Sequence, residues 1–300
     1  MSAFKHILVP TDFSECANQA IIHAFNIAGL SAARVTLLHI VTIFDDDPYN
    51  PEQKFPDLDK YYAMLETSAG GAIRDTVRHR RVSEVEVEQI VRRGFSASEV
   101  ILDIAAENPV DLIVMGTHGR KPLAHLLLGS VAESVVRHAR CPVLTCRVMP
   151  TEYEIAGGYR RILIPTDFSE SSRRALEAAA RLLPETGGQL DVLHVVEDNI
   201  HPAYYVGGKT SIFDLLPDIR ERSLQALREF VDFPGLKDVR TESMIREGKT
   251  VNQIIEHCNR QRIDLIALGS RGLSDLEYLL IGSVTERVVR KSTCPVLTVK

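Results

Sequence analysis

Residues 116–130 read GTHGRKPLAHLLLGS, and residues 269–283 read GSRGLSDLEYLLIGS. Glycines occupy the same three positions in both stretches, and each stretch ends in Gly-Ser, while the residues between them largely differ. An apolar segment precedes the first glycine in each case, and a helix-like segment follows the last one. The recurrence of this spacing in the same setting predicts two copies of one structural unit.

Three further landmarks recur in the same order and support a duplication. ILVPTDFSE at 7–15 returns as ILIPTDFSE at 162–170, which is 155 residues later, with eight of nine residues identical. We therefore predict two domains of the same fold. The other two landmarks are VTLLHIV at 35–41 with LDVLHVV at 190–196, and CPVLT at 141–145 with CPVLT at 294–298.

The boundary between the copies is expected where regular patterns stop. Pro150 and the pair Gly157-Gly158 interrupt any helical or strand periodicity. We accordingly predict a first domain over residues 1–148, a linker over 149–158 and a second domain over 159–300.

Composition and charge argue against several classes of protein. Of the 300 residues, 45% are hydrophobic and 25% are charged, which is typical of a globular chain. The net charge of -5 argues against non-specific electrostatic binding of nucleic acid over a broad surface. No apolar run approaches the ~18 residues of a membrane span, and the start, MSAFKHILVP, lacks the apolar core of a signal peptide. The five cysteines include no C-x-x-C pair, which favours free thiols in a reducing compartment and no metal site. We expect a cytoplasmic protein.

Strand-like and helix-like segments alternate within each copy. Their strands are continuously apolar, which predicts a parallel sheet covered by helices on both faces. Each copy is thus expected to be a doubly wound, Rossmann-like α/β domain with five parallel strands, whose ligands bind beyond the carboxyl ends of the strands. In the first copy we expect strands at 5–10, 33–41, 85–91, 111–116 and 141–146, and helices at 15–30 (with Ser14 as N-cap), 58–80, 96–106 and 130–139.

The glycine stretches run from a strand end to a helix start, and two interpretations of them stay open. A helix N-terminus offers unpaired N–H groups and a partial positive charge to a phosphate, and glycine lets the backbone approach a ligand closely. Alternatively, Ser130 with Glu133, and Ser283 with Glu286, form S-x-x-E capping boxes that only stabilise the helices.

The G-x2-G-x9-G-S spacing after a strand, with an aspartate just past the first strand, resembles the universal stress protein family over nearly the whole chain, twice. The resemblance implies a tandem member with the adenine nucleotide alpha hydrolase-like fold, and it implies ATP, with or without Mg²⁺, as the ligand. The phosphates and ribose would be bordered by Met115, Gly116, Gly119, Arg120, Gly129, Ser130 and Val131, and by Leu268, Gly269, Arg271, Gly272, Gly282, Ser283 and Val284. The base and ribose would be bordered by Pro10, Thr11, Asp12 and Val41, and by Pro165, Thr166, Asp167 and Val196.

The PTDFS turn follows the first strand of each copy, at residues 10–14 and 165–169, and contains a phenylalanine and an aspartate that bear on the site. Many family members have glycine where this chain has Phe13 and Phe168; we expect the rings to pack under the first helix of each copy, with crowding of the base as the alternative. Asp12 and Asp167 are expected to contact the ligand, although a carboxylate at such a turn can instead accept hydrogen bonds from nearby backbone N–H groups.

The same resemblance implies a function in which ATP occupancy regulates a stress response through a protein partner. No catalytic residue is assigned, so slow ATP hydrolysis and a ligand-free scaffold remain as alternatives. His118, Arg120 and Lys121 in the first loop predict tighter binding by the first copy. The two CPVLT segments are expected to pair within the chain as a pseudo-dimer, which could dimerise further.

Overall fold

A computed structural model shows two compact α/β units, one before and one after residues 149–157, which contain nearly all of the expected linker. The linker segment 149–157 lies outside the described residues, so the domain boundaries given above stay predictions. The structure describes residues 4–43, 58–79, 85–119, 128–148, 158–184, 187–197, 211–270 and 281–300.

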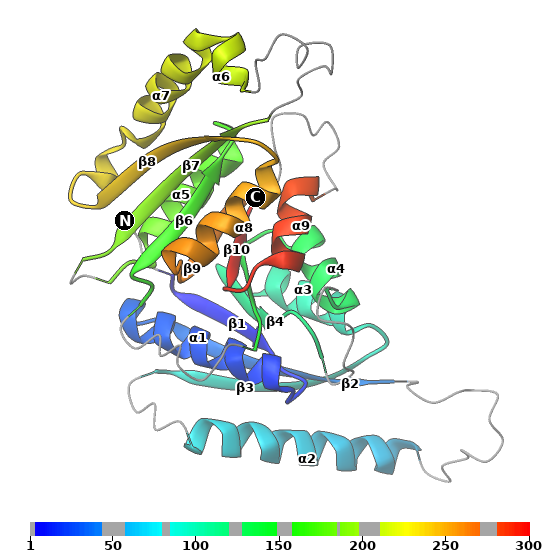
Figure 1. Cartoon of the computed structure of the whole chain (residues 1–300). Coiled ribbons are helices and arrows are strands. Elements are labelled where there is room, and N and C mark those ends of the chain that lie inside the picture. Colours follow the sequence, from blue (N-terminus) through cyan, green and yellow to red (C-terminus); the bar gives the residue numbers. More distant parts are fainter. Residues whose placement is uncertain are drawn as a thin grey trace, which may run out of the picture. The chain divides into compact units, whose positions relative to one another are not determined.

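The first unit is a five-stranded parallel sheet in the order β3-β2-β1-β4-β5 (Figure 1). The chain moves outward from β1 to β3 and then returns to the other side of β1, so the strand order reverses between β1 and β4. This confirms the predicted doubly wound fold. Its elements are β1 (His6–Pro10), α1 (Glu15–Ser31), β2 (Arg34–Thr42), α2 (Leu58–His79), β3 (Val87–Gly94), α3 (Ala97–Glu107), β4 (Leu112–Gly116), α4 (Ser130–His138) and β5 (Val143–Cys146).

The second unit repeats this topology with the order β8-β7-β6-β9-β10, all parallel. Between its second and third strands, a short helix and a 3-10 turn accompany the long helix. Its elements are β6 (Arg161–Thr166), α5 (Glu170–Ala180), β7 (Gln189–Val196), α6 (Ile212–Leu215), α7 (Pro217–Val231), η2 (Pro234–Leu236), β8 (Arg240–Glu247), α8 (Thr250–Gln261), β9 (Leu265–Gly269), α9 (Ser283–Lys291) and β10 (Val296–Val299).

Helices cover both faces of each sheet, as right-handed crossovers require. In the first unit α1 contacts β1, β4 and β5, while α3 and α4 pack against each other; in the second unit α8 and α9 form the equivalent pair (Figure 1). The central strands are buried on both sides, with Ile7, Leu8, Ile162 and Leu163 fully inaccessible to solvent. This explains why their sequences are continuously apolar.

Local sequence explains where the first helix of each unit begins. The Ser14 side chain accepts a hydrogen bond from the Ala17 N–H, which confirms Ser14 as the N-cap of α1, and Ser169 caps α5 through the Ser172 N–H in the same way. One face of α1 is apolar and buried, and it includes Ala17, Ala20, Ile21, Ala24 and Ala28.

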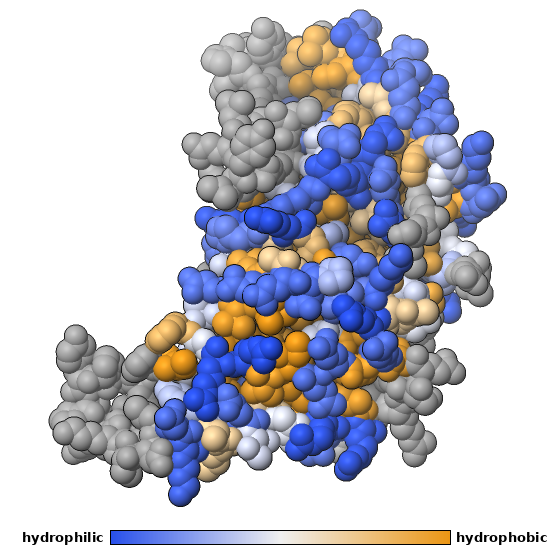
Figure 2. Space-filling model, turned by 180° about the vertical axis from the view of Figure 1, so that it is seen from behind, coloured by the Kyte–Doolittle hydropathy of each residue, from blue (hydrophilic) through white to orange (hydrophobic). Residues whose placement is uncertain are grey.

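On the face shown in Figure 2, hydrophobic patches lie between hydrophilic side chains. The large apolar side chains that are exposed include Met64 on α2 and Phe95 after β3. None of the helices that the structure describes is both long and apolar enough to cross a membrane.

Candidate functional site

The candidate site lies at the carboxyl ends of the strands, and its first part is the turn after the first strand of each unit. The Asp12 Oδ1 accepts a hydrogen bond from the Ser14 N–H at 3.0 Å, and Asp167 does the same for Ser169 at 3.0 Å. One carboxylate oxygen therefore stabilises the turn, as the alternative interpretation predicted. The other oxygen of Asp12 lies close to the glycine loop, the segment from the first to the last repeated glycine (116–129, and 269–282 in the second unit). A Cβ built on Gly119 of this loop would be 2.7 Å from Oδ2.

Phe13 and Phe168 occupy strained positions in this turn. Their φ angles are 64° and 67°, a left-handed conformation that bulky residues rarely adopt. The Phe13 ring packs against the His39 ring with centroids 4.7 Å apart, and Phe168 packs against His194 at 4.4 Å. Each ring thus contacts a histidine on the second strand of its unit. Packing of the rings under the first helix, and the alternative that they crowd the base, both stay predictions.

His39 and His194 lock this turn to the neighbouring strand. The Nδ1 of His39 is 2.8 Å from the Thr11 carbonyl oxygen, and the Nδ1 of His194 is 2.9 Å from that of Thr166. Since a carbonyl only accepts, each Nδ1 carries the proton, which fixes the tautomer of both rings. The matched positions of these histidines in the two copies were the sequence signal for this role.

The glycine that ends β4 or β9 has a structural task in both units. A Cβ on Gly116 would lie 2.9 Å from the backbone carbon of Cys16, and a Cβ on Gly269 would lie 2.8 Å from that of Ser171. Only glycine lets the first turn of α1 or α5 approach the strand this closely. These two glycines therefore hold the helix that follows the PTDFS turn against the strand end.

The base of each glycine loop is closed by a backbone hydrogen bond. The N–H of Gly129 donates to the Thr117 carbonyl at 2.8 Å, and the N–H of Gly282 donates to that of Ser270 at 2.8 Å. Thr117 and Ser270 are buried and were not predicted as site residues. Their signal in the sequence was a small hydroxyl residue directly after the first glycine in both copies.

The helices that follow begin without the predicted capping boxes, so this alternative was wrong. Gly129 and Gly282 are the N-caps of α4 and α9, and neither helix has a side-chain cap. Ser130 and Ser283 are instead the first helical residues, and both are exposed. The expected partner carboxylates form ion pairs one turn further on, Glu133 with Arg137 at 3.1 Å and Glu286 with Arg290 at 2.9 Å.

Four further predicted residues contribute buried side chains to the core near this edge of the sheet. Met115, Leu268, Val41 and Val196 are buried near the ends of their strands. Arg120, Arg271 and Gly272 lie outside the described residues. The described residues predicted for the site are Pro10, Thr11, Asp12, Val41, Met115, Gly116, Gly119, Gly129, Ser130 and Val131 in the first unit, and Pro165, Thr166, Asp167, Val196, Leu268, Gly269, Gly282, Ser283 and Val284 in the second.

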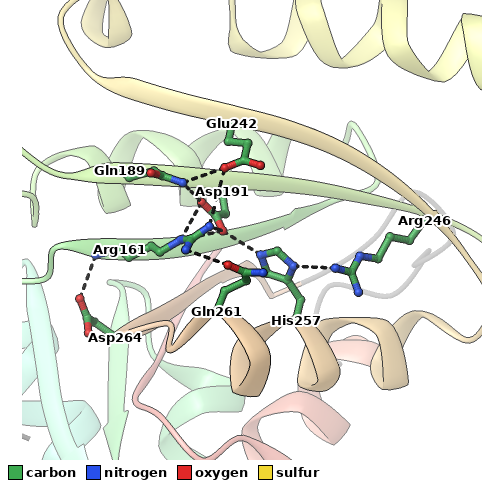
Figure 3. Close-up of polar contacts among 8 residues, drawn as sticks. All are labelled: Arg161, Gln189, Asp191, Glu242, Arg246, His257, Gln261 and Asp264. Carbon is green, nitrogen blue, oxygen red and sulfur yellow. Dashed lines mark hydrogen bonds and ion pairs between the residues drawn. The ribbon is translucent and has the colours of Figure 1, made fainter.

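A second polar cluster, which the sequence did not reveal, lies on β6, β7, β8 and α8 of the second unit (Figure 3). Asp191 is fully buried and contacts the Arg161 Nη2 at 2.9 Å and the His257 Nε2 at 2.7 Å. Arg246 donates to the Nδ1 of His257 at 3.1 Å, so Nε2 carries the proton that Asp191 accepts. Burial raises the pKa of Asp191, but hydrogen bonds from His257, Arg161 and Gln189 and the Arg161 charge outweigh it and lower the pKa below its ordinary value.

The first unit has a different cluster at the equivalent place. The His6 Nε2 is 2.8 Å from the Thr36 hydroxyl, which in turn donates to Glu88 at 2.9 Å, and Arg34 donates to the His6 Nδ1 at 3.0 Å. Thr36 pairs with Glu88 across β2 and β3 as Asp191 pairs with Glu242 across β7 and β8. The buried carboxylate of the second unit is thus replaced by a neutral hydroxyl in the first.

The class of protein is defined by two tandem Rossmann-like domains. In each domain, the glycine loop runs from a strand end to a helix that has no side-chain N-cap. The family model of the universal stress protein family matches residues 3–147 and 158–300. The chain belongs to this family, as a tandem member.

Individual relatives agree with this assignment. The chain is 29% identical over 147 residues to universal stress protein YxiE of Bacillus subtilis, covering 47% of this chain and 99% of that protein. It is 32% identical over 155 residues to universal stress protein MJ0577 of Methanocaldococcus jannaschii, covering 48% and 95%. The crystal structure of a universal stress protein from Archaeoglobus fulgidus superimposes with a TM-score of 0.73 at 23% identity, covering 98% of each chain, and supports the tandem fold.

Proposed function

We propose that each unit binds one adenine nucleotide, ATP, at the carboxyl edge of its sheet, and that ATP occupancy makes the protein a nucleotide-dependent regulatory module in a stress response. The observation that carries the proposal is the start of α4 and α9. In each, an exposed serine follows a glycine N-cap, and no side chain caps the helix. A helix start in this state retains N–H donors for a phosphate.

The chemistry of the surrounding residues fits a nucleotide. The N–H groups of the first helical turn, with the hydroxyl of Ser130 or Ser283, would donate to phosphate oxygens. Asp12 and Asp167 lie in the turn that borders the site, and a carboxylate can accept a hydrogen bond from a ribose hydroxyl. ATP enters with or without Mg²⁺ on its own phosphate oxygens, and no protein residue is assigned to the metal.

The first unit is proposed to bind more tightly than the second. The first loop contains His118, Arg120 and Lys121, whereas Arg271, Leu273 and Ser274 stand at the equivalent places of the second. Exposed cations near phosphates are expected to add about 1 kcal/mol or less, which corresponds to a fewfold difference in affinity.

A charge placed at the helix start tests the phosphate site without weakening the fold. Ser130→Glu and Ser283→Glu put a carboxylate at the first helical position, where it favours the helix dipole and repels a phosphate. We expect each variant to lose about tenfold or more in ATP affinity at its own site, with an unchanged or raised unfolding midpoint. Unchanged affinity in both variants, measured by titration calorimetry, would contradict the proposal. Ser130→Gln and Ser283→Gln are the uncharged controls of similar size.

Assembly and location remain parts of this proposal. We propose a cytoplasmic protein whose CPVLT segments pair within the chain, with a homodimer as the further possibility. Sedimentation of the full chain at several concentrations tests assembly: a single monomeric mass agrees with intrachain pairing, and a mass that doubles with concentration reveals the homodimer. Cell fractionation tests location.

A further inference from the structure

Two cysteines of the second unit lie in direct contact, away from the candidate nucleotide site. Cys258 is in the last turn of α8, and Cys294 stands just before β10; their sulfur atoms are 3.3 Å apart, and both are free thiols. Both side chains are buried, but their chain neighbours Asn259 and Thr293 are exposed and hydrogen-bonded to each other at 2.9 Å. The pair therefore lies directly beneath the surface.

The surroundings of the two thiols differ and give them different roles. A hydrogen bond from Cys294 lowers the pKa of Cys258 despite burial, with help from Thr293. Burial, together with the hydrogen bond to Cys258, raises the pKa of Cys294. Ser292 holds Cys294 from the other side, because its hydroxyl donates to the Cys294 carbonyl at 2.8 Å and accepts from the Cys294 N–H at 3.2 Å. Cys258 is thus the sulfur that ionises first, while Cys294 keeps its proton.

The first unit provides an internal comparison. Cys141 stands 153 residues before Cys294, and the residue 153 positions before Cys258 is Ala105. The first unit therefore has the cysteine before its last strand but alanine in place of the second thiol. Duplication alone does not require a pair of contacting thiols in one copy.

We propose that Cys258 and Cys294 form an oxidisable dithiol, a modification site at which a hydroperoxide produces an intrachain disulfide. The Cys258 thiolate attacks the peroxide, the O–O bond breaks, and the products are a Cys258 sulfenic acid and hydroxide. The sulfur of Cys294 then attacks the sulfenic sulfur, and the Cys294 proton and the sulfenic hydroxyl leave as water. The peroxide is reduced and two thiols are oxidised, so electrons and atoms balance.

Little movement is needed to form this bond. A disulfide requires a separation of about 2.05 Å, and the sulfurs start 3.3 Å apart. Access for the oxidant is expected through opening of the last turn of α8, which ends three residues after Cys258, at Gln261. The bond would join α8 to the residue just before β10 and would enclose the glycine stretch of the second copy.

The experiment is peptide mapping of the intact, folded chain after exposure to hydrogen peroxide. The reduced protein is oxidised, the remaining thiols are alkylated, and the protein is digested without reductant. We expect a Cys258–Cys294 linked peptide, lost again after treatment with dithiothreitol, while Cys141 stays available to the alkylating agent. A folded protein that shows no such peptide, or shows Cys258 oxidised beyond the sulfenic acid without a link, would overturn the proposal.

Two single variants separate the steps. With Cys294→Ala, a sulfenic acid at Cys258 should persist and be trapped by dimedone; with Cys258→Ala, neither the adduct nor the link should form. Trapping at Cys294 instead would overturn the assigned order of attack. If either alanine variant fails to fold, the linked peptide of the unmodified chain still decides the proposal.

Discussion

The two units share their strand registers, yet they differ at the polar clusters of β1 and β2 in one and β6 and β7 in the other. The first unit contains the neutral Thr36 hydroxyl next to His6, and the second contains the buried Asp191 carboxylate next to Arg161 and His257. At the carboxyl ends, by contrast, the turn, the loop closure and the uncapped helix start are the same in both units.

The duplicated fold therefore accommodates different buried polar clusters in its two copies, whereas the geometry of the candidate site is the same in both.

A second difference between the units lies in their first helices. His23 is buried in α1, and burial lowers its pKa to about 4, while Ala178 stands 155 residues later in α5. The first unit thus buries His6 and His23, whereas in the second unit the buried His257 shares its cluster with the Asp191–Arg161 ion pair. This difference predicts different responses to mutation and to acid.

The largest expected effect comes from removing the buried carboxylate. Asp191→Ala leaves Arg161 and His257 without their shared partner and should destabilise the second unit by about 3 kcal/mol. The matched change in the first unit, Thr36→Ala, removes a neutral hydrogen bond and should cost about 1 kcal/mol. Amide hydrogen exchange of β7 and β2 in the intact chain measures each unit separately. Equal losses of stability in the two variants would contradict the proposed difference between the two clusters.

Acid should weaken the first unit before the second. The folded first unit holds His23 neutral, while the unfolded chain takes up a proton below pH 6.5, so stability present above pH 6.5 is lost as the pH falls to about 4. A shift of this size corresponds to about 3 kcal/mol. His6 adds to the loss in the same direction, because burial and the Arg34 charge lower its pKa.

The second unit should resist this range of pH. Its Asp191 has a lowered pKa in the folded state, so its contribution is present above pH 3.8 and is lost only as the pH falls further. Hydrogen exchange between pH 7 and pH 4 checks the order of loss. In His23→Ala, which introduces the residue found at the second unit's equivalent position, the pH dependence of the first unit should become much flatter; an unchanged slope would show that His23 is not its cause.

The smallest effect concerns the two serines at helix starts in the first unit. Ser14→Ala removes a true N-cap and should cost about 1 kcal/mol, whereas Ser130→Ala alters a first helical residue without a cap bond and should change stability by less than about 0.5 kcal/mol. Urea unfolding of the two variants provides the comparison. A loss at Ser130 as large as that at Ser14 would restore the capping-box interpretation.

Much of this architecture was predictable from local patterns. The alternating apolar strands, the Ser14 cap and the repeated landmarks predicted the α/β class and the duplication, because each is a short-range signal. The capping boxes failed because S-x-x-E does not reveal whether the serine or the preceding glycine is the N-cap. The Asp191 cluster was missed because its residues come from separate elements that only the fold brings together.

The same limit applies to Cys258 and Cys294. They are 36 residues apart, and no C-x-x-C spacing marks them, yet helix α8 places one sulfur against the other. The positive φ angles of Phe13 and Phe168 were not predicted either. The signal for them was the glycine that many family members have at these positions, because glycine is the residue that favours such a conformation.

The most direct test of the central claim is the number of nucleotides bound per chain. Equilibrium dialysis of the full-length protein against labelled ATP, after removal of any nucleotide that copurifies, gives this number without assuming which site is tighter. We predict about two ATP per chain, falling to about one in Ser130→Glu or Ser283→Glu. No binding at millimolar ATP by a folded protein would contradict it and would leave the glycine loops as structural features alone.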